Sequence, residues 1–197
     1  MNGIRPQVSR EKAWQLLVRQ HTGWLKRVLK LVLPKQGRGD LPANTRRQPK
    51  LEMVWMPCHH LRFPLSKDGR EGAIELLIGG HDATVTRLRG GGVEVQEVSD
   101  LEAFAPTVGT EEAVEIAREQ LTLARVREPG WNNQNLDVGH PEIDLWQYPY
   151  WAYYYERRKG MLDVLLLDAV TGKPVGSRTK AAFLAAITAE PTEPEAP

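Results

Sequence analysis

The sequence contains a single cysteine, Cys58, among 197 residues, so no disulfide framework can form within the chain. No apolar run reaches the roughly 18 residues that a membrane-spanning helix needs. The N-terminus also has no apolar segment followed by a cleavage site, as a secretory signal would have. These absences fit a reducing compartment, and we expect a cytoplasmic protein without a transmembrane segment.

The signature motifs of several enzyme classes are also missing. Gly90-Gly91-Gly92 has no following Lys-Ser/Thr pair and no following helix, so it is read as a turn and not as a phosphate loop. No serine elbow or dinucleotide-binding fingerprint is present. Asp163 and Asp168 would lie on opposite faces of one strand, which argues against a paired-carboxylate acid-base site. We therefore expect no catalytic residue and no cofactor.

Positive charge is concentrated at the start of the chain. Residues 1–50 hold twelve basic and two acidic residues, a net charge of +10, whereas the whole chain has a net charge of +1. This segment either docks on the acidic remainder of the protein or faces an anionic partner, such as nucleic acid or a lipid surface. Within residues 24–50, the residues predicted to contact such a partner are Lys26, Arg27, Lys30, Arg46 and Arg47.

The periodicity of apolar residues predicts a mixed α and β protein. Helices are expected over residues 10–21, 111–126 and 180–188, and residues 24–33 are compatible with either a helix or a strand. Strands are expected over residues 51–65, 73–78, 83–88, 93–98, 143–156 and 161–167. Residues 34–50 read as a loop, and the polar, proline-rich tail 189–197 is expected to be disordered.

The order of these elements suggests an internal repeat. The segment from Arg10 to Gln20 aligns with that from Thr110 to Gln120, Pro57 with Pro149, and Asp82-Ala83-Thr84 with Asp168-Ala169-Val170-Thr171. We therefore predict an α+β protein of two repeats, each a helix packed on a small antiparallel sheet. The predicted domains are 1–100, with the basic segment and the loop, and 101–188.

The second half of the chain resembles a PepSY domain. The resemblance rests on Thr110–Ala117, on the aromatic strand that follows, and on the Asp168–Val175 segment with its Asp-Ala-x-Thr-Gly turn, and it covers residues 108–176. It implies a helix on a small antiparallel sheet, a fold also like that of cystatins. It further implies a binding module without catalytic residues, since PepSY-like domains are associated with inhibitory propeptides and with ligand or protein binding.

All five tyrosines lie within residues 148–155. Strand alternation places Trp151, Tyr153 and Tyr155 on one face and Tyr150, Ala152 and Tyr154 on the other, and one of these faces should pack beneath the helix that begins at Glu111. The other face is either covered by the other repeat or forms an exposed aromatic surface for a peptide, another subunit or stacked bases. The residues predicted for this aromatic surface are Trp146, Tyr148, Tyr150, Trp151, Tyr153 and Tyr155.

Cys58-His59-His60 combines residue types that bind metals or act in catalysis. On a strand, Cys58 and His60 share one face and His59 points to the other, which leaves too few ligands for a zinc site. We expect no metal site. The predicted function is non-catalytic binding of a protein or peptide partner, with a homo-oligomer as one arrangement. The alternatives are an enzyme with a cleft between the repeats near Cys58 and His60, or a binder of anionic surfaces through residues 24–50.

Overall fold

The computed structural model describes residues 1–18, 50–67, 69–88, 93–98, 104–127, 136–158 and 161–188. The predicted tail 189–197 and the predicted loop 34–50, apart from Lys50, lie outside these residues. The segment 24–33, predicted as a helix or a strand, also lies outside the described residues.

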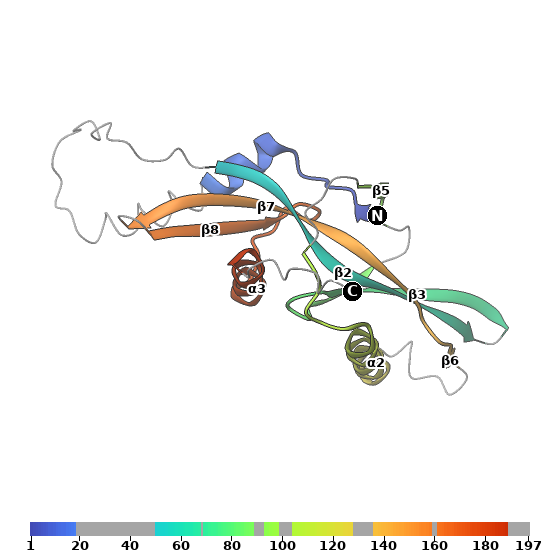
Figure 1. Ribbon diagram of the computed structural model, residues 1–197. Helices are drawn as coiled ribbons and strands as arrows, with labels where there is room; N and C mark the ends of the chain where they lie inside the picture. The colour runs from blue at the N-terminus through green and yellow to red at the C-terminus, as the bar shows by residue number, and fades with distance from the viewer. Residues whose placement is uncertain are drawn as a thin grey trace, which may run out of the picture. The chain divides into compact units, whose positions relative to one another are not determined.

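Strands dominate the described part of the chain (Figure 1). They are β1 (Asn2–Ile4), β2 (Lys50–Lys67), β3 (Arg70–Gly79), β4 (Val85–Leu88), β5 (Val95–Glu97), β6 (Leu136–Val138), β7 (Glu142–Arg158) and β8 (Met161–Asp168). Helices occupy residues 10–18, α2 (Thr110–Arg127) and α3 (Ser177–Thr188). The helix predicted over residues 111–126 is confirmed to within one residue at each end.

The eight strands form one mixed sheet in the order β4-β3-β2-β7-β1-β5, with β6 beside β2 and β8 beside β7. β1 and β7 are parallel and meet at Gly3 and Gln147, whereas the hairpins β2–β3 and β7–β8 are antiparallel. The predicted fold of two helix-on-small-sheet repeats is therefore wrong. Its error has a physical reason: β2 and β7, of 18 and 17 residues, pair with each other, and this joins strands that were expected in separate sheets.

Two compact units share this sheet, and each takes residues from both halves of the chain. The first, which we call the α2 unit, contains residues 1–5, 55–148 and 176–197. The second, which we call the N-helix unit, contains residues 6–54 and 149–175. The long strands β2 and β7 are each divided between the two units.

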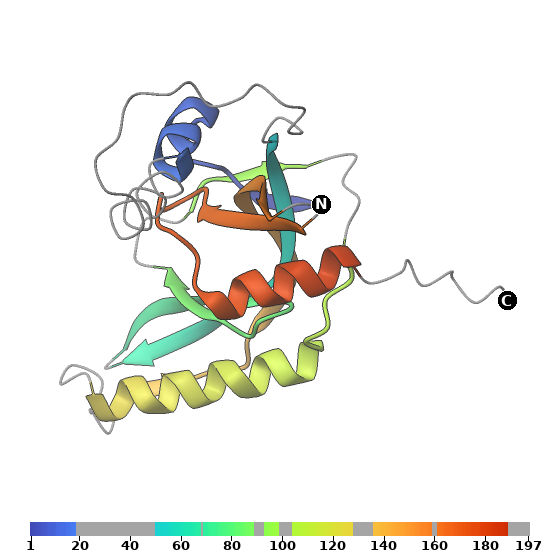
Figure 2. The ribbon, with the colours of Figure 1, turned by 90° about the vertical axis from the view of Figure 1, so that its left-hand side faces the viewer.

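In the α2 unit, α2 covers one face of the β2–β3 hairpin (Figure 2). The helix follows from its sequence, because Ala113, Ala117 and Leu121 recur every four residues and form its buried stripe. Glu111 and Glu112 in the first turn, with arginines in the last turn, also match the helix dipole. The stripe packs against buried strand residues, which are Leu61, Phe63, Ile74, Leu76 and Ile78.

In the N-helix unit, the helix at residues 10–18 packs on the β7–β8 hairpin. Ala13 and Leu17 contact the cluster that contains Trp151, Tyr153 and Leu167. Strand alternation correctly predicts that Trp151 and Tyr153 share a face. The helix beneath that face, however, is the one at residues 10–18 and not the predicted α2, because α2 packs on β2 and β3 instead.

A matching backbone arrangement ends the hairpin in each unit. In the α2 unit, the Gly80 amide donates to the Pro57 carbonyl at 2.8 Å, and the Thr107 and Val108 amides donate to the Gly80 carbonyl. In the N-helix unit, the equivalent donors are the Ala169 amide, to the Pro149 carbonyl at 3.2 Å, and the Gln7 and Val8 amides, to the Ala169 carbonyl. These bonds attach the segment before each helix to the hairpin on which that helix packs.

Asp82 holds the turn that follows the β2–β3 hairpin. The Asp82 carboxylate accepts from the Thr84 amide at 3.0 Å and from the Thr179 hydroxyl of α3. Between them, Ala83 has a φ of 54°, which the Asp82 bonds help to hold. Burial raises the pKa of Asp82, but the hydrogen bonds from Thr179 and Thr84 and the charge of Arg178 outweigh it and lower the pKa below its ordinary value.

We predict that Asp82 makes stability depend on pH in the acidic range. Because the folded-state pKa is lowered, the ionised carboxylate stabilises the fold above the unfolded pKa, and this contribution is lost as pH falls through the folded pKa. Asp82→Asn should therefore cost about 1–2 kcal/mol at pH 7, and less at pH 3. Urea unfolding across this range measures the difference. The exposed Glu71→Gln is the control, and a difference for Asp82→Asn that grows toward pH 3 would contradict the assignment.

Candidate ligand-binding hollow

The structure does not bring the six predicted aromatic residues together on one exposed surface. Trp146 and Tyr148 belong to the α2 unit, and the other four belong to the N-helix unit. Trp146, Trp151 and Tyr153 are buried, and the remaining three, Tyr148, Tyr150 and Tyr155, are half-buried. The Trp146 ring stacks on the His60 ring with 3.8 Å between centroids. The burial of these side chains indicates that they mainly pack within the protein.

In the N-helix unit, the aromatic residues fasten the helix at residues 10–18 to β7. The Trp151 indole donates to the Val8 carbonyl at 2.8 Å. The Tyr153 ring meets the edge of the Trp14 ring at 5.5 Å and stacks on Tyr155 at 6.1 Å. Trp14, at 40% exposure, is the aromatic ring of this group that reaches the surface.

The predicted basic segment lies outside the described residues. This applies to Lys26, Arg27, Lys30, Arg46 and Arg47, all of which fall within residues 19–49. Binding of an anionic surface through residues 24–50 stays a prediction.

Cys58 and His60 lie on β2, where burial governs their chemistry. Burial raises the pKa of the Cys58 thiol to about 12, the opposite of the shift that activates a nucleophilic cysteine. His60 lies 3.5 Å from the Glu75 carboxylate through Nε2 and 4.0 Å from the Asp144 carboxylate through Nδ1. Among the described residues, no group of three or more His, Cys, Asp or Glu side chains is placed to hold a metal ion. The pair therefore lacks an activated nucleophile.

A hollow of about 530 Å3 opens between α2 and β6 in the α2 unit, and we call it the α2–β6 hollow. Its floor is apolar and consists of Phe63 from β2, Leu121 from α2 and Val138 from β6. Phe63 is 1% exposed and Leu121 7% exposed, so the floor is also part of the core of the α2 unit. The volume lies in the range of small-molecule sites.

Two features of the fold create this hollow. β6 pairs with the end of β2, where Leu65 faces Val138, and residues 137–140 form the wall opposite α2. The Gly139 amide then donates to the Pro64 carbonyl at 2.9 Å. A side chain at Gly139 would bring its Cβ to 2.8 Å from the Pro64 ring, so this close approach requires glycine.

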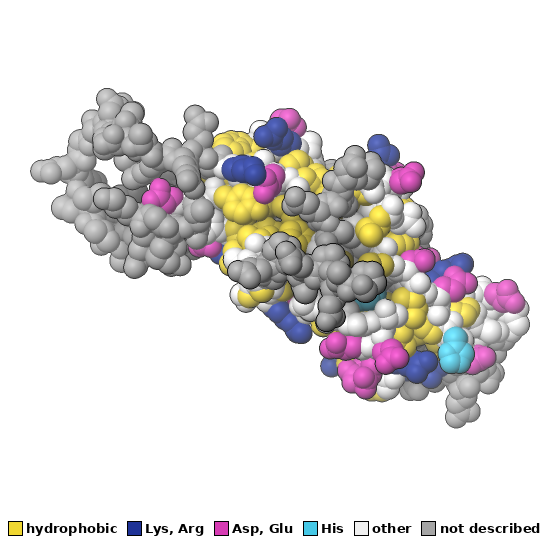
Figure 3. Space-filling model, in the orientation of Figure 1, with side chains coloured by type: hydrophobic (Ala, Val, Ile, Leu, Met, Phe, Trp, Pro, Cys, Tyr) yellow, Lys and Arg dark blue, Asp and Glu magenta, His cyan; other side chains and the backbone are white. Residues whose placement is uncertain are grey.

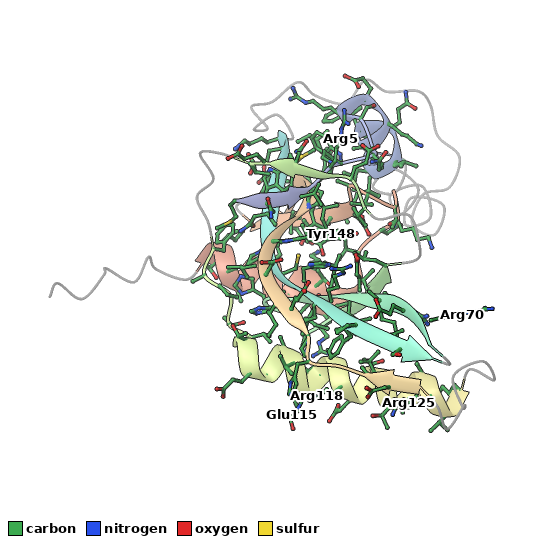
Figure 4. All side chains as sticks on the ribbon, turned by 90° about the vertical axis from the view of Figure 1, so that its right-hand side faces the viewer. Arg5, Arg70, Glu115, Arg118, Arg125 and Tyr148 are labelled. Carbon is green, nitrogen blue, oxygen red and sulfur yellow. The ribbon has the colours of Figure 1, made fainter. Side chains whose placement is uncertain are left out.

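The α2 wall of the hollow is basic. Arg118, Thr122 and Arg125 line it, and their spacing of four and three residues places them along one side of the helix. Figure 4 shows Arg118 and Arg125 projecting from α2, and Figure 3 shows basic side chains and a histidine close to hydrophobic ones between α2 and β6. The Thr122 hydroxyl donates to the Arg118 carbonyl at 2.9 Å. The guanidinium of Arg118 forms no ion pair with another described residue.

The opposite wall comes from β6 and the residues after it. Asp137 and His140 line this side and are both exposed. Among the described lining residues, two arginines and one aspartate carry a formal charge. A basic wall over an apolar floor can hold an anionic or polar group at the wall and an apolar group at the floor.

Two apolar side chains at the start of β7, Ile143 and Leu145, are exposed on the sheet face that α2 covers elsewhere. Trp146 stacks on His60, and His60 alternates on β2 with Leu61 and Phe63, which pack under α2. Trp146 therefore lies on the sheet face away from α2, and Ile143 and Leu145 lie on the α2 face. These two side chains are 38% and 39% exposed.

None of the residues that line this hollow was predicted as a site residue from the sequence. The sequence of α2 does indicate the basic wall, because the spacing of Arg118, Thr122 and Arg125 places these polar side chains along one side of the helix. The other wall gave no signal, because residues 129–141 read as a loop and the pairing of β6 with β2 joins segments about 70 residues apart. The site thus depends on a long-range pairing that local patterns do not reveal.

Comparisons with protein-family models, with curated proteins and with solved structures found no match. The resemblance of residues 108–176 to a PepSY domain therefore stays a prediction. Within the described residues, the helices are too short or too polar to cross a membrane.

Proposed function

We propose that this protein is a non-catalytic binding protein and that the α2–β6 hollow holds a small ligand with an apolar body. The observation that carries the proposal is the hollow itself: a volume of about 530 Å3 with an apolar floor formed by the buried Phe63 and Leu121 and the partly buried Val138. Apolar bodies favour such floors because contact removes apolar surface from water.

The lining residues support a role in ligand binding rather than in catalysis. Thr122 is the one hydroxyl-bearing side chain among the described lining residues, and its proton is donated to the Arg118 carbonyl. Among the described residues, no base accepts a hydrogen bond from this hydroxyl. Cys58, with a pKa of about 12, does not line the hollow. Groups that orient a ligand are present, whereas an activated nucleophile is not part of the described lining.

The test uses 1-octanol as a neutral apolar probe, with backbone amide NMR shifts as the readout. We expect saturable shifts at Phe63, Leu121 and Val138, because the probe displaces water from this floor. Thr122→Trp places a large ring in the hollow and should abolish these shifts.

The matched control is Gln120→Trp, which adds the same ring on an exposed position of α2 outside the hollow. This variant should bind 1-octanol like the unchanged protein. Shifts that are absent from the floor, or that persist unchanged in Thr122→Trp, would overturn the proposal.

A further inference from the structure

We infer that the ligand of the α2–β6 hollow is a monocarboxylate with an unbranched apolar chain, whose head group is held by Arg118. This inference rests on the proposed function and specifies the ligand class. It follows from the position of Arg118 on the basic wall and from the apolar side chains of the floor and of the nearby start of β7.

Arg118 carries the first step. Its guanidinium has no ion pair with another described residue, although Asp137 lines the same hollow. Arginine presents its N–H groups in a planar fork that matches the two oxygens of a carboxylate, and such bonds are stronger than those between neutral groups. An arginine beside an apolar floor, without an ion pair to a carboxylate of the described residues, is placed to receive a carboxylate from a ligand.

The charge of the lining sets the charge of the head group. Arg118 and Arg125 lie seven residues apart, two helical turns, so both border the hollow from one side of α2. Asp137 lines the facing wall and repels negative charge on a ligand. A carboxylate with one negative charge therefore meets less repulsion from Asp137 than a doubly charged phosphate would.

The shape of the apolar surface favours a chain. The floor of Phe63, Leu121 and Val138 lies beside β6, and β7 follows β6 in the chain and also pairs with β2. Ile143 and Leu145 then present exposed apolar side chains on the α2 face of the sheet. An unbranched chain can lie along β6 and the start of β7 with its head group at Arg118, and each methylene removed from water adds to binding.

The experiment compares sodium octanoate with 1-octanol and with sodium acetate in amide NMR titrations of the full chain. We expect octanoate to bind about tenfold more tightly than 1-octanol, because its carboxylate gains charge-assisted hydrogen bonds. Acetate should leave the shifts at Phe63 unchanged. Arg118→Gln should weaken octanoate about tenfold and leave 1-octanol affinity unchanged.

Arg70→Gln is the charge-matched control, because Arg70 is exposed at the start of β3 and does not line the hollow (Figure 4). It should bind octanoate like the unchanged protein. Equal affinities for octanoate and 1-octanol at the same floor residues would overturn the carboxylate inference and leave the proposed function standing. Equal weakening by Arg70→Gln and Arg118→Gln would also overturn it. If neither probe shifts the floor residues, the proposed function fails as well.

Discussion

Trp151→Ala is expected to lower the free energy of unfolding by about 3–5 kcal/mol, the range for removing a buried tryptophan side chain. Trp151 is 7% exposed and packs in one cluster with Ala13 and Leu17 of the helix at residues 10–18. Its indole also donates to the Val8 carbonyl at 2.8 Å. Alanine would therefore leave a cavity and an unpaired buried carbonyl.

The matched control for this substitution is Trp14→Ala. Trp14 belongs to the same unit but is 40% exposed, and its recorded ring contact is the edge contact with Tyr153. We expect a loss of about 1 kcal/mol, because an aromatic pair of this kind contributes little beyond its buried area. Urea unfolding measures both variants, and equal losses would contradict the assignment of Trp151 to the core and Trp14 to the surface.

Gly80→Ala has the second large expected effect, a loss of about 1–3 kcal/mol. A Cβ at Gly80 would lie 2.7 Å from the Pro57 carbonyl oxygen and 3.0 Å from the Pro106 side chain. The backbone cannot simply move aside, because the Gly80 amide bonds to Pro57 and its carbonyl accepts from Thr107 and Val108. A shift that relieves the contact would lengthen these three hydrogen bonds.

Gly72→Ala provides the comparison for Gly80→Ala. Gly72 lies in β3, and a Cβ there meets no atom within 4 Å. Alanine should be neutral or slightly stabilising at this position, since it lowers the entropy of the unfolded chain. Thermal unfolding of the two variants separates steric crowding from the general effect of replacing glycine. Comparable losses at both positions would contradict the close approach at Gly80.

The features that could be predicted from the sequence are those with local causes. The helix α2 follows from the four-residue spacing of Ala113, Ala117 and Leu121 and from its charged ends, and these interactions lie within the helix or on one face of it. The β7–β8 hairpin follows in the same way from two apolar runs around a glycine-containing turn. The shared face of Trp151 and Tyr153 follows from the two-residue period of a strand.

The features that were missed depend on which distant segments pair. Nothing local to Gly3 indicates that it lies parallel to β7 at Gln147, more than 140 residues away. Likewise, both helices are amphipathic, and an apolar stripe does not specify which hairpin it covers. The burial of Trp146 against His60 depends on the same long-range arrangement, which is why an aromatic cluster predicted as a surface is mostly packing.

The candidate site shows the same division between local and long-range causes. Its basic wall lies on a helix that could be predicted, so the spacing of Arg118, Thr122 and Arg125 was visible. Its floor combines Phe63 from β2 with Val138 from β6, and these meet only because β6 pairs with the end of β2. The hollow therefore exists only in the folded chain.

The central claim, that the α2–β6 hollow binds a ligand, is tested most directly by intermolecular nuclear Overhauser effects between unlabelled octanoate and protonated, 13C-labelled protein. We predict contacts from the octanoate chain to the ring protons of Phe63 and to the methyl groups of Leu121 and Val138. Contacts confined to the N-helix unit, for example to Trp14, with none at Phe63, would contradict the claim.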